Sequence, residues 1–123
     1  MNPRGRRGEE FAVRTLVEEG LRILAVNYHS RYGEVDIIAT DGESLCFVEV
    51  KTRKEGSMVP PEQAVPLSKQ RKIIKTALQY MGESELEYQP RFDLFAVVTG
   101  SGGEVTAHDW MKGAFDGDAY QGC

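Results

Sequence analysis

Three charged side chains stand inside two apolar runs that are typical of neighbouring strands. Asp36 interrupts the run EVDII, and Glu49 and Lys51 interrupt the run FVEVK. Side chains alternate along a strand, so Glu49 and Lys51 project from the same face. A hairpin between the two runs would place Asp36 beside that pair. Two close carboxylates suit a hard cation such as Mg²⁺, and an adjacent lysine can orient water or neutralise charge on a phosphate.

These groups together predict a site for metal-dependent hydrolysis of a phosphodiester. Asp36 and Glu49 would hold the metal, and Lys51 would assist the attacking water. A structural alternative stays open, in which Lys51 forms an ion pair with Glu49 or Asp36 within the sheet. A Glu-x-Lys triplet is common by chance, so its weight comes from its place in a strand that follows the strand of Asp36.

The apolar periodicity predicts elements in the order α-β-β-β-α-β-β. The first three strands are expected to form an antiparallel meander, and the strand after the second helix implies a crossover connection. Ser68 is a candidate N-cap for the second helix, and GSGG at residues 100–103 is typical of a hairpin turn. The expected bounds are residues 6–20, 21–28, 34–41, 45–52, 69–81, 91–99 and 104–110.

The expected fold is α/β, with a mixed central sheet flanked by helices in one domain over residues 1–123. Its core would run from about residue 6 to 110, with a short helix and frayed tail over 111–123. Apolar residues on one side of each helix should face the sheet. They are Phe11, Ala12, Leu16 and Val17 in the first helix and Ile73, Ile74, Ala77, Leu78 and Met81 in the second.

Composition points to a soluble protein, because 41% hydrophobic and 28% charged residues are ordinary values for one. No apolar run approaches the roughly 20 residues of a membrane span, and the start MNPRGRRGEEF lacks the apolar stretch of a secretory signal. We therefore expect a cytoplasmic protein. The two cysteines and two histidines lack the spacing of metal ligands and are interpreted as ordinary residues: Cys46, Cys123, His29 and His108.

Charge is unevenly distributed, although the net charge is −4. The stretch from Lys51 to Lys75 carries seven basic residues against two acidic ones, whereas the chain from Thr76 onward carries two against eight. A local basic stretch can attract phosphate even in an acidic protein. A solvated helix face explains the same pattern, and charge alone leaves both interpretations open.

Five motifs in a fixed order give the chain its clearest likeness. They are GEEFA (8–12), NYHSRYGEVDIIA (27–39), FVEVKTR (47–53), SKQRKIIKTALQY (68–80) and RFDLFAVV (91–98). With these motifs the chain resembles the YraN-like family of predicted bacterial nucleases, which have the restriction-endonuclease-like fold. The order of helix glutamate, strand aspartate and Glu-x-Lys is more distantly similar to archaeal-type Holliday-junction resolvases.

The resemblance implies that Asp36, Glu49 and the Val50 carbonyl bind Mg²⁺ or Mn²⁺, and that Lys51 is the catalytic lysine. Glu9 falls where the family places a further acidic residue that can complete the metal site. An acid near a helix N-terminus is also favoured by the macrodipole, and the neighbouring Glu10 offers the same group one position along.

Glu34 belongs to the same family motif and should point to the face of Asp36, as a residue that supports the ligands. His29 departs from the pattern, because many members have arginine there.

The resemblance implies that the partner is DNA. If the likeness to resolvases extends to the substrate, this DNA is branched or otherwise structured. The same likeness implies a homodimer. Lys69 and Gln70 occupy a position where related nucleases often place groups that help to hold the site or the phosphate, although a solvated helix face is the stronger explanation for them. An alternative is a nucleic-acid-binding module that has lost turnover. The residues expected to contact phosphates are Arg6, Arg7, Arg53, Lys54, Lys69, Gln70, Arg71, Lys72 and Lys75.

Overall fold

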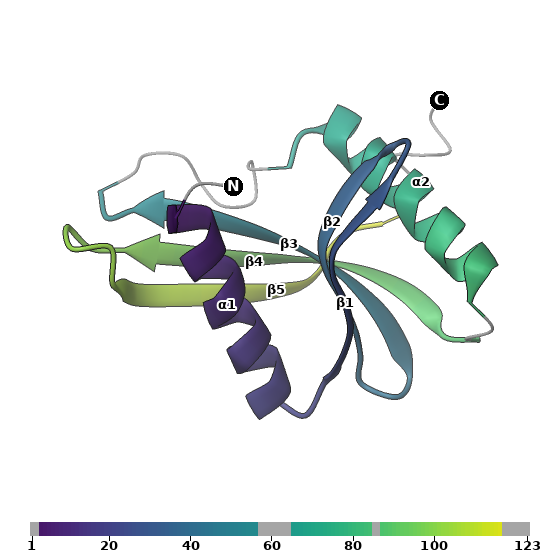
Figure 1. Cartoon of the computed structure of the whole chain (residues 1–123), viewed down its shortest axis with the longest axis horizontal. Coiled ribbons are helices and arrows are strands. Elements are labelled where there is room, and N and C mark those ends of the chain that lie inside the picture. Colours follow the sequence, from purple (N-terminus) through teal and green to yellow (C-terminus); the bar gives the residue numbers. More distant parts are fainter. Residues whose placement is uncertain (1–2, 57–64, 85–86, 117–123) are drawn as a thin grey trace.

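One five-stranded mixed sheet and two helices make up the computed structural model, which describes residues 3–56, 65–84 and 87–116 (Figure 1). The strand order is β1-β2-β3-β4-β5. The element order and the α/β class predicted from the sequence are confirmed. The bounds are α1 Pro3–Glu18, β1 Arg22–Ser30, β2 Gly33–Thr40, β3 Ser44–Lys54, α2 Leu67–Glu83, β4 Gln89–Thr99 and β5 Val105–Phe115.

The strand pairing agrees with the predicted meander and crossover. β1, β2 and β3 are consecutive antiparallel neighbours, whereas β4 lies parallel to β3 after the chain has passed through α2. β5 returns antiparallel to β4 through a tight turn, in which Gly103 N–H donates to the Gly100 carbonyl at 3.0 Å. This sheet is consistent with the restriction-endonuclease-like fold.

Each helix covers a different face of the sheet, as the alternation along β3 shows. Leu45 and Phe47 pack in the cluster under α2, whereas Cys46 and Val48 pack in the cluster under α1. The predicted apolar faces are correct in their centres and wrong at their margins. Val17 is 53% exposed and Leu78 is 51% exposed, because each lies at the edge of its helical stripe.

The β1–β2 hairpin separates from β3 at the position of Asp36. The last pair between β2 and β3 is Ile37 with Val48, and beyond it the hairpin bends away toward α2 (Figure 1). Val35 therefore breaks the expected alternation and joins Ile38 in the cluster under α2. The separation opens a fork between two strands, and polar side chains occupy this fork.

Two element ends differ from the sequence predictions. Ser68 does not cap α2, because the carbonyl of Pro66 already accepts the N–H groups of Lys69 and Gln70 and the helix begins at Leu67. β5 extends to Phe115, where a helix and tail had been expected, and residues 117–123 lie outside the described part of the chain. Within the described residues, no helix is long and apolar enough to cross a membrane.

Candidate active site

Asp36 lies at the fork between β2 and β3 and is only 9% exposed. The backbone N–H of Val50 donates to Asp36 Oδ2 at 2.8 Å, just beyond the last residue pair of the β2–β3 ladder. Burial raises the pKa of Asp36 to about 7; the negative charge of Glu49 adds to the effect, and the Val50 N–H opposes it. The carboxylate is thus held in place by one backbone group while its environment disfavours its charge.

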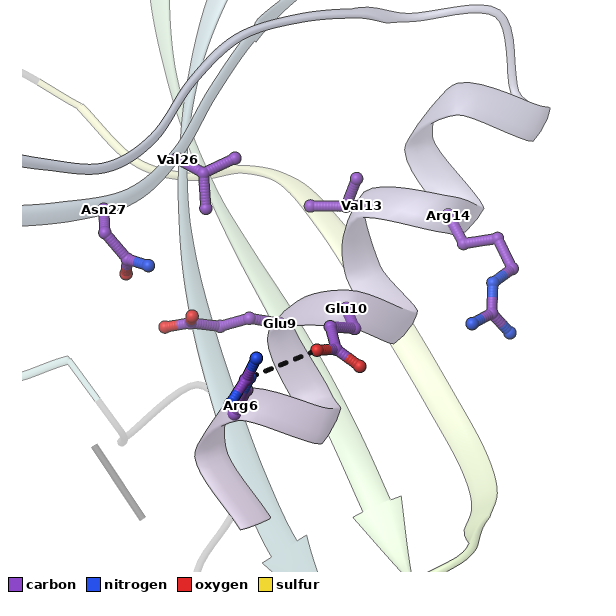
Figure 2. Close-up of a pocket in the computed structure, with 7 residues that line it drawn as sticks. All are labelled: Arg6, Glu9, Glu10, Val13, Arg14, Val26 and Asn27. Atoms are coloured by element: carbon purple, nitrogen blue, oxygen red, sulfur yellow. Dashed lines mark ion pairs between the residues drawn. The ribbon is translucent and has the colours of Figure 1, made fainter. Parts of the chain in front are cut away.

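Glu9 reaches the same point from α1, which approaches β3 closely at Gly8. A β-carbon on Gly8 would collide with Thr52 Oγ1, so glycine permits the helix to lie against the strand. Glu9 also has a side-chain hydrogen bond with Asn27, and Figure 2 shows the two side chains pointing toward one another across the pocket between α1 and β1. The close approach of α1 therefore sets the position of Glu9.

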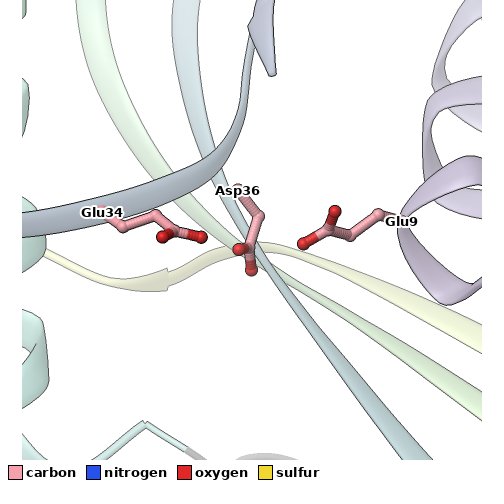
Figure 3. Close-up of side chains that lie close together, drawn as sticks. All are labelled: Glu9, Glu34 and Asp36. Atoms are coloured by element: carbon pink, nitrogen blue, oxygen red, sulfur yellow. The ribbon is translucent and has the colours of Figure 1, made fainter. Parts of the chain in front are cut away.

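Glu34 completes a group of three carboxylates with Glu9 and Asp36, whose oxygen atoms all lie within 4.8 Å of one another (Figure 3). Glu34 shares the face of Asp36, as predicted. Burial raises the pKa of Glu9, and the charges of Glu34 and Glu49 raise it further. Hydrogen bonds that the Glu9 carboxylate accepts from protonated Asp36 and from the Asn27 amide oppose the rise. Three oxygen ligands this close together fit a hard divalent cation, whose charge would favour the ionised forms of Glu9 and Asp36.

Glu49 and Lys51 share a face of β3, as predicted, but Glu49 is held by two lysines. Glu49 Oε1 lies 2.6 Å from Lys69 Nζ and 3.6 Å from Lys51 Nζ, and Glu49 is 5% exposed. Burial lowers the pKa of Lys51, and the neighbouring Lys69 ammonium lowers it further. Burial also lowers the pKa of Lys69, but the hydrogen bond and charge of Glu49 outweigh this and the net pKa is raised.

A pocket of about 370 Å³ at the fork is lined by part of the predicted site, whereas Glu9, Val50 and Lys51 are not among its lining residues. Its lining includes both predicted carboxylates, Asp36 and Glu49, together with Glu34 from β2 and Lys69 and Lys72 from α2. The three-carboxylate group uses Glu9 and Glu34 with Asp36, whereas Glu49 lies across the pocket with the lysines. Metal binding by these residues and by the Val50 carbonyl remains a prediction.

The expected phosphate-binding residues lie on α1, on the end of β3 and on α2, and two of them, Lys69 and Lys72, line this pocket. On α2, Gln70 Nε2 donates to the Val65 carbonyl at 2.9 Å and thereby anchors the helix start. On α1, Arg6 pairs with Glu10 at 3.4 Å, and Arg7 Nη1 donates to the Gly103 carbonyl at 2.8 Å. The remaining residues lie on the end of β3 or on α2: Arg53, Lys54, Lys69, Arg71, Lys72 and Lys75.

Two residues that the sequence reasoning did not place in the site lie next to it. Asn27 has a φ of 54°, a left-handed conformation that asparagine tolerates better than most residues, and its side chain reaches Glu9. An asparagine within an otherwise aliphatic strand was the available signal. His29 Nδ1 lies 3.4 Å from Glu34 Oε2, a contact that depends on the pairing of β1 with β2. Cys46 and His108 contribute to packing, since Cys46 is buried and His108 stacks on Phe95.

Comparison with known proteins supports the likeness suggested by the five motifs. The model of the family described as "Uncharacterised protein family UPF0102" matches residues 8–97. The chain is 42% identical over 119 residues to a UPF0102 protein of Anaeromyxobacter dehalogenans (strain 2CP-C), covering 96% of this chain and 87% of the relative. It is 46% identical over 99 residues to one of Rhodococcus opacus (strain B4), covering 80% and 84%. The chain belongs to the UPF0102 family, which is the YraN-like family that its motifs resemble.

Proposed function

We propose that this protein is a divalent-metal-dependent nuclease that hydrolyses phosphodiester bonds of DNA. The observation that carries the proposal is the meeting of Glu9, Glu34 and Asp36 at the strand fork, where one carboxylate oxygen of each lies within 4.8 Å of the others. Lys51 and Lys69, which both contact Glu49, supply positive charge next to this group. Such a site presents oxygen ligands on one side and fixed positive charge on the other. A phosphate needs both, because its transition state gains negative charge that must be stabilised.

The carboxylates and Lys51 would have different roles in the reaction. Glu9, Glu34 and Asp36 would hold Mg²⁺ or Mn²⁺, which would polarise the phosphate and acidify a bound water. Glu49 would join them as its contacts to the lysines loosen. Lys51 has a lowered pKa and lies beside this group, so it suits the role of accepting a proton from the attacking water or orienting it.

Positively charged residues of α2 and of the end of β3 would bind the phosphates on either side of the cleaved bond. Lys72 and Lys54 are exposed and available for such contacts. Binding that depends on phosphate contacts weakens steeply as salt increases. The homodimer implied by the resemblance remains a prediction that a solution mass measurement can test.

A nucleic-acid-binding module without turnover is the second candidate, and one observation favours it. Glu49 forms a 2.6 Å ion pair with Lys69, and this pair competes with any metal for the same carboxylate. If this ion pair persists in solution with Mg²⁺ present, the basic surface would bind DNA, and the acidic group would contribute only to the stability of the fold.

Cleavage of labelled linear, flapped and four-way DNA in Mg²⁺ or Mn²⁺ separates the two candidates. We expect Lys51→Ala to lower the cleavage rate by about 10²- to 10⁴-fold, the range for a group that moves a proton in the transition state. Lys112→Ala is the matched control, because it removes an exposed lysine from β5 at the far edge of the sheet. Thermal melting of each variant would show that the fold is intact.

Two results decide the matter. Metal-dependent cleavage by the wild type and Lys112→Ala, lost in Lys51→Ala, would establish the nuclease. Salt-sensitive DNA binding by all three proteins, with no cleavage by the wild type in either metal, would contradict it and favour the binding module.

A further inference from the structure

A second pocket lies beside the acidic one, with a different chemical character. Its volume is about 530 Å³, and its lining comprises Arg31 and Tyr32 of the β1–β2 turn with Lys75, Leu78 and Gln79 of α2. Carboxylates dominate one side of the first pocket, whereas this lining contributes an aromatic ring, an aliphatic side chain and two cations. Leu78 is 51% exposed, so part of the apolar lining is open to solvent.

The Tyr32 ring lies among cations. The guanidinium carbon of Arg31 is 5.0 Å from the ring centroid, and Lys75 Nζ is 5.7 Å from it. Arg31 Nη2 also donates to the Tyr32 hydroxyl at 2.8 Å, which restricts the ring. Tyr32 is partly buried. A partly exposed aromatic ring flanked by positive charge is the combination by which proteins bind single-stranded nucleic acid, with bases stacked on rings and phosphates contacting cations.

The two pockets follow one another along the same helix. Lys69 and Lys72 line the acidic pocket, and Lys75 and Leu78 line the second. Gly33 follows Tyr32 and lines the acidic pocket, and a β-carbon at Gly33 would lie 3.5 Å from Lys72 Cβ. The rise of 1.5 Å per helical residue separates the two groups by about 9 Å. At the axial spacing of about 3.4 Å in a duplex this distance corresponds to two or three nucleotides, and to fewer in a more extended single strand.

We propose that the pocket of Arg31, Tyr32, Lys75, Leu78 and Gln79 binds an unpaired nucleotide a few positions from the phosphate in the acidic site. The base stacks against Tyr32 and Leu78, and Arg31 and Lys75 contact the adjoining phosphates. A base within a duplex has both faces covered by its neighbours and cannot reach the ring. The inference rests on the proposed nuclease function and specifies its substrate: DNA with a single-stranded segment beside the cleaved bond.

Binding to a fluorescent single-stranded oligonucleotide and to a duplex of equal length, measured by anisotropy with EDTA present, tests the pocket without any cleavage. Tyr32→Ala should weaken single-strand binding by about 5- to 100-fold, the loss of one stacked base, and change duplex binding less than about twofold. Tyr32→Phe keeps the ring and should bind like the wild type. Tyr32 lies on a turn, and thermal melting would check that both variants fold.

Lysine variants add a readout that a structural role would not change. Lys75→Gln should reduce the slope of log affinity against log salt by about 0.7, the contribution of one phosphate contact on a single strand. Lys112→Gln is the matched control, because Lys112 also lies over an aromatic ring, 4.5 Å from the Trp110 centroid, but on the opposite edge of the sheet. Its slope should equal that of the wild type.

The outcomes separate this inference from the proposed function. If the wild type cleaves DNA while Tyr32→Ala keeps full single-strand affinity, the nuclease stands and the pocket assignment is wrong. If Tyr32→Ala loses single-strand affinity and the wild type cleaves nothing, the pocket stands and the nuclease is wrong. Equal losses on single-stranded and duplex DNA would overturn the assignment to an unpaired nucleotide.

Discussion

Two buried aspartates of the same sheet, Asp93 in β4 and Asp36 in β2, have opposite surroundings. Asp93 is fully buried and accepts hydrogen bonds from Arg91 Nε and Nη2, each at 2.9 Å. It also accepts from Trp110 Nε1 at 2.9 Å and from Gly113 N–H at 3.0 Å. Asp36 accepts one hydrogen bond from a backbone group, the Val50 N–H, and its other close neighbours are carboxylates, with the Lys69 ammonium as the opposing charge.

The difference separates a buried carboxylate whose charge is compensated within the fold from one whose charge the fold compensates poorly. A buried charge is stable only where partners compensate for its lost hydration. Asp93 has such partners within the fold and ties β4 to β5. At Asp36, burial and the charges of Glu49 and Glu9 raise the pKa to about 7, although the Val50 N–H and the Lys69 ammonium oppose the rise. Its compensation is expected to come from a ligand that binds at the fork.

The largest expected difference in stability comes from changing each of the two aspartates to asparagine. Asp93→Asn should lower the free energy of unfolding by about 3–5 kcal/mol, because it leaves the Arg91 charge beside a neutral amide in a buried network. Asp36→Asn should leave the metal-free protein as stable as the wild type or more stable, since it removes charge from a repulsive group. Urea unfolding with EDTA at pH 8 measures both. Equal losses in the two variants would break the comparison.

The order of elements could be predicted because it follows from apolar periodicity and turn residues, which are local. The start of α2 could not, because Pro66 rather than the Ser68 side chain satisfies the first N–H groups. The exposure of Val17 and Leu78 depends on how far each helix rotates against the sheet, which the helical pattern leaves open by one position.

The sequence also contained enough to predict part of the candidate site. Asp36, Glu49 and Lys51 could be grouped because alternation and a hairpin suffice to bring them together. Glu9 could be assigned to the site only from the family resemblance, because its position depends on the close approach of α1 to β3 at Gly8. The contacts of Asn27 and Lys69 depend on the fork and on the placement of α2. In sequence VDI around Asp36 and FDL around Asp93 look alike, and only their three-dimensional neighbours distinguish them.

A change in pH should alter the free energy of unfolding somewhat less than the Asp93 substitution does, and the direction of the change can be predicted. Folded Asp36 holds its proton up to a pKa of about 7, whereas its ordinary pKa is 3.8, so the folded state binds more protons between these values. Stability of the metal-free protein should therefore fall as pH rises from about 4 to about 7, by on the order of 2–4 kcal/mol. Urea unfolding across this range measures the slope.

Asp36→Asn is the control for that slope, because an amide does not titrate. The difference in stability between the wild type and Asp36→Asn should grow in favour of the variant as pH rises. Parallel curves for the two proteins would show that another group carries the pH dependence.

Binding of a divalent metal should change the stability of the folded protein less than the aspartate substitutions or the change in pH. A cation that binds only the folded state stabilises it by about 2.7 kcal/mol at a concentration of 100 times its Kd, which corresponds to roughly 10 °C in Tm for a chain of this size. We expect Mn²⁺ or Mg²⁺ to raise the Tm of the wild type and of a destabilised but folded Asp93→Asn. The Tm of Asp36→Asn and Glu9→Gln should respond much less.

Protons and the cation compete for the same carboxylates, so the metal-induced rise in Tm should be larger at pH 8 than at pH 6. At pH 6 part of the binding energy is used to remove the proton that Asp36 still holds, with its pKa of about 7. At pH 8 the repulsion among the three carboxylates is at its greatest, and the cation relieves it. A metal response that is unchanged by pH and survives in Asp36→Asn would place the cation elsewhere, and the contrast between Asp36 and Asp93 would then concern stability alone.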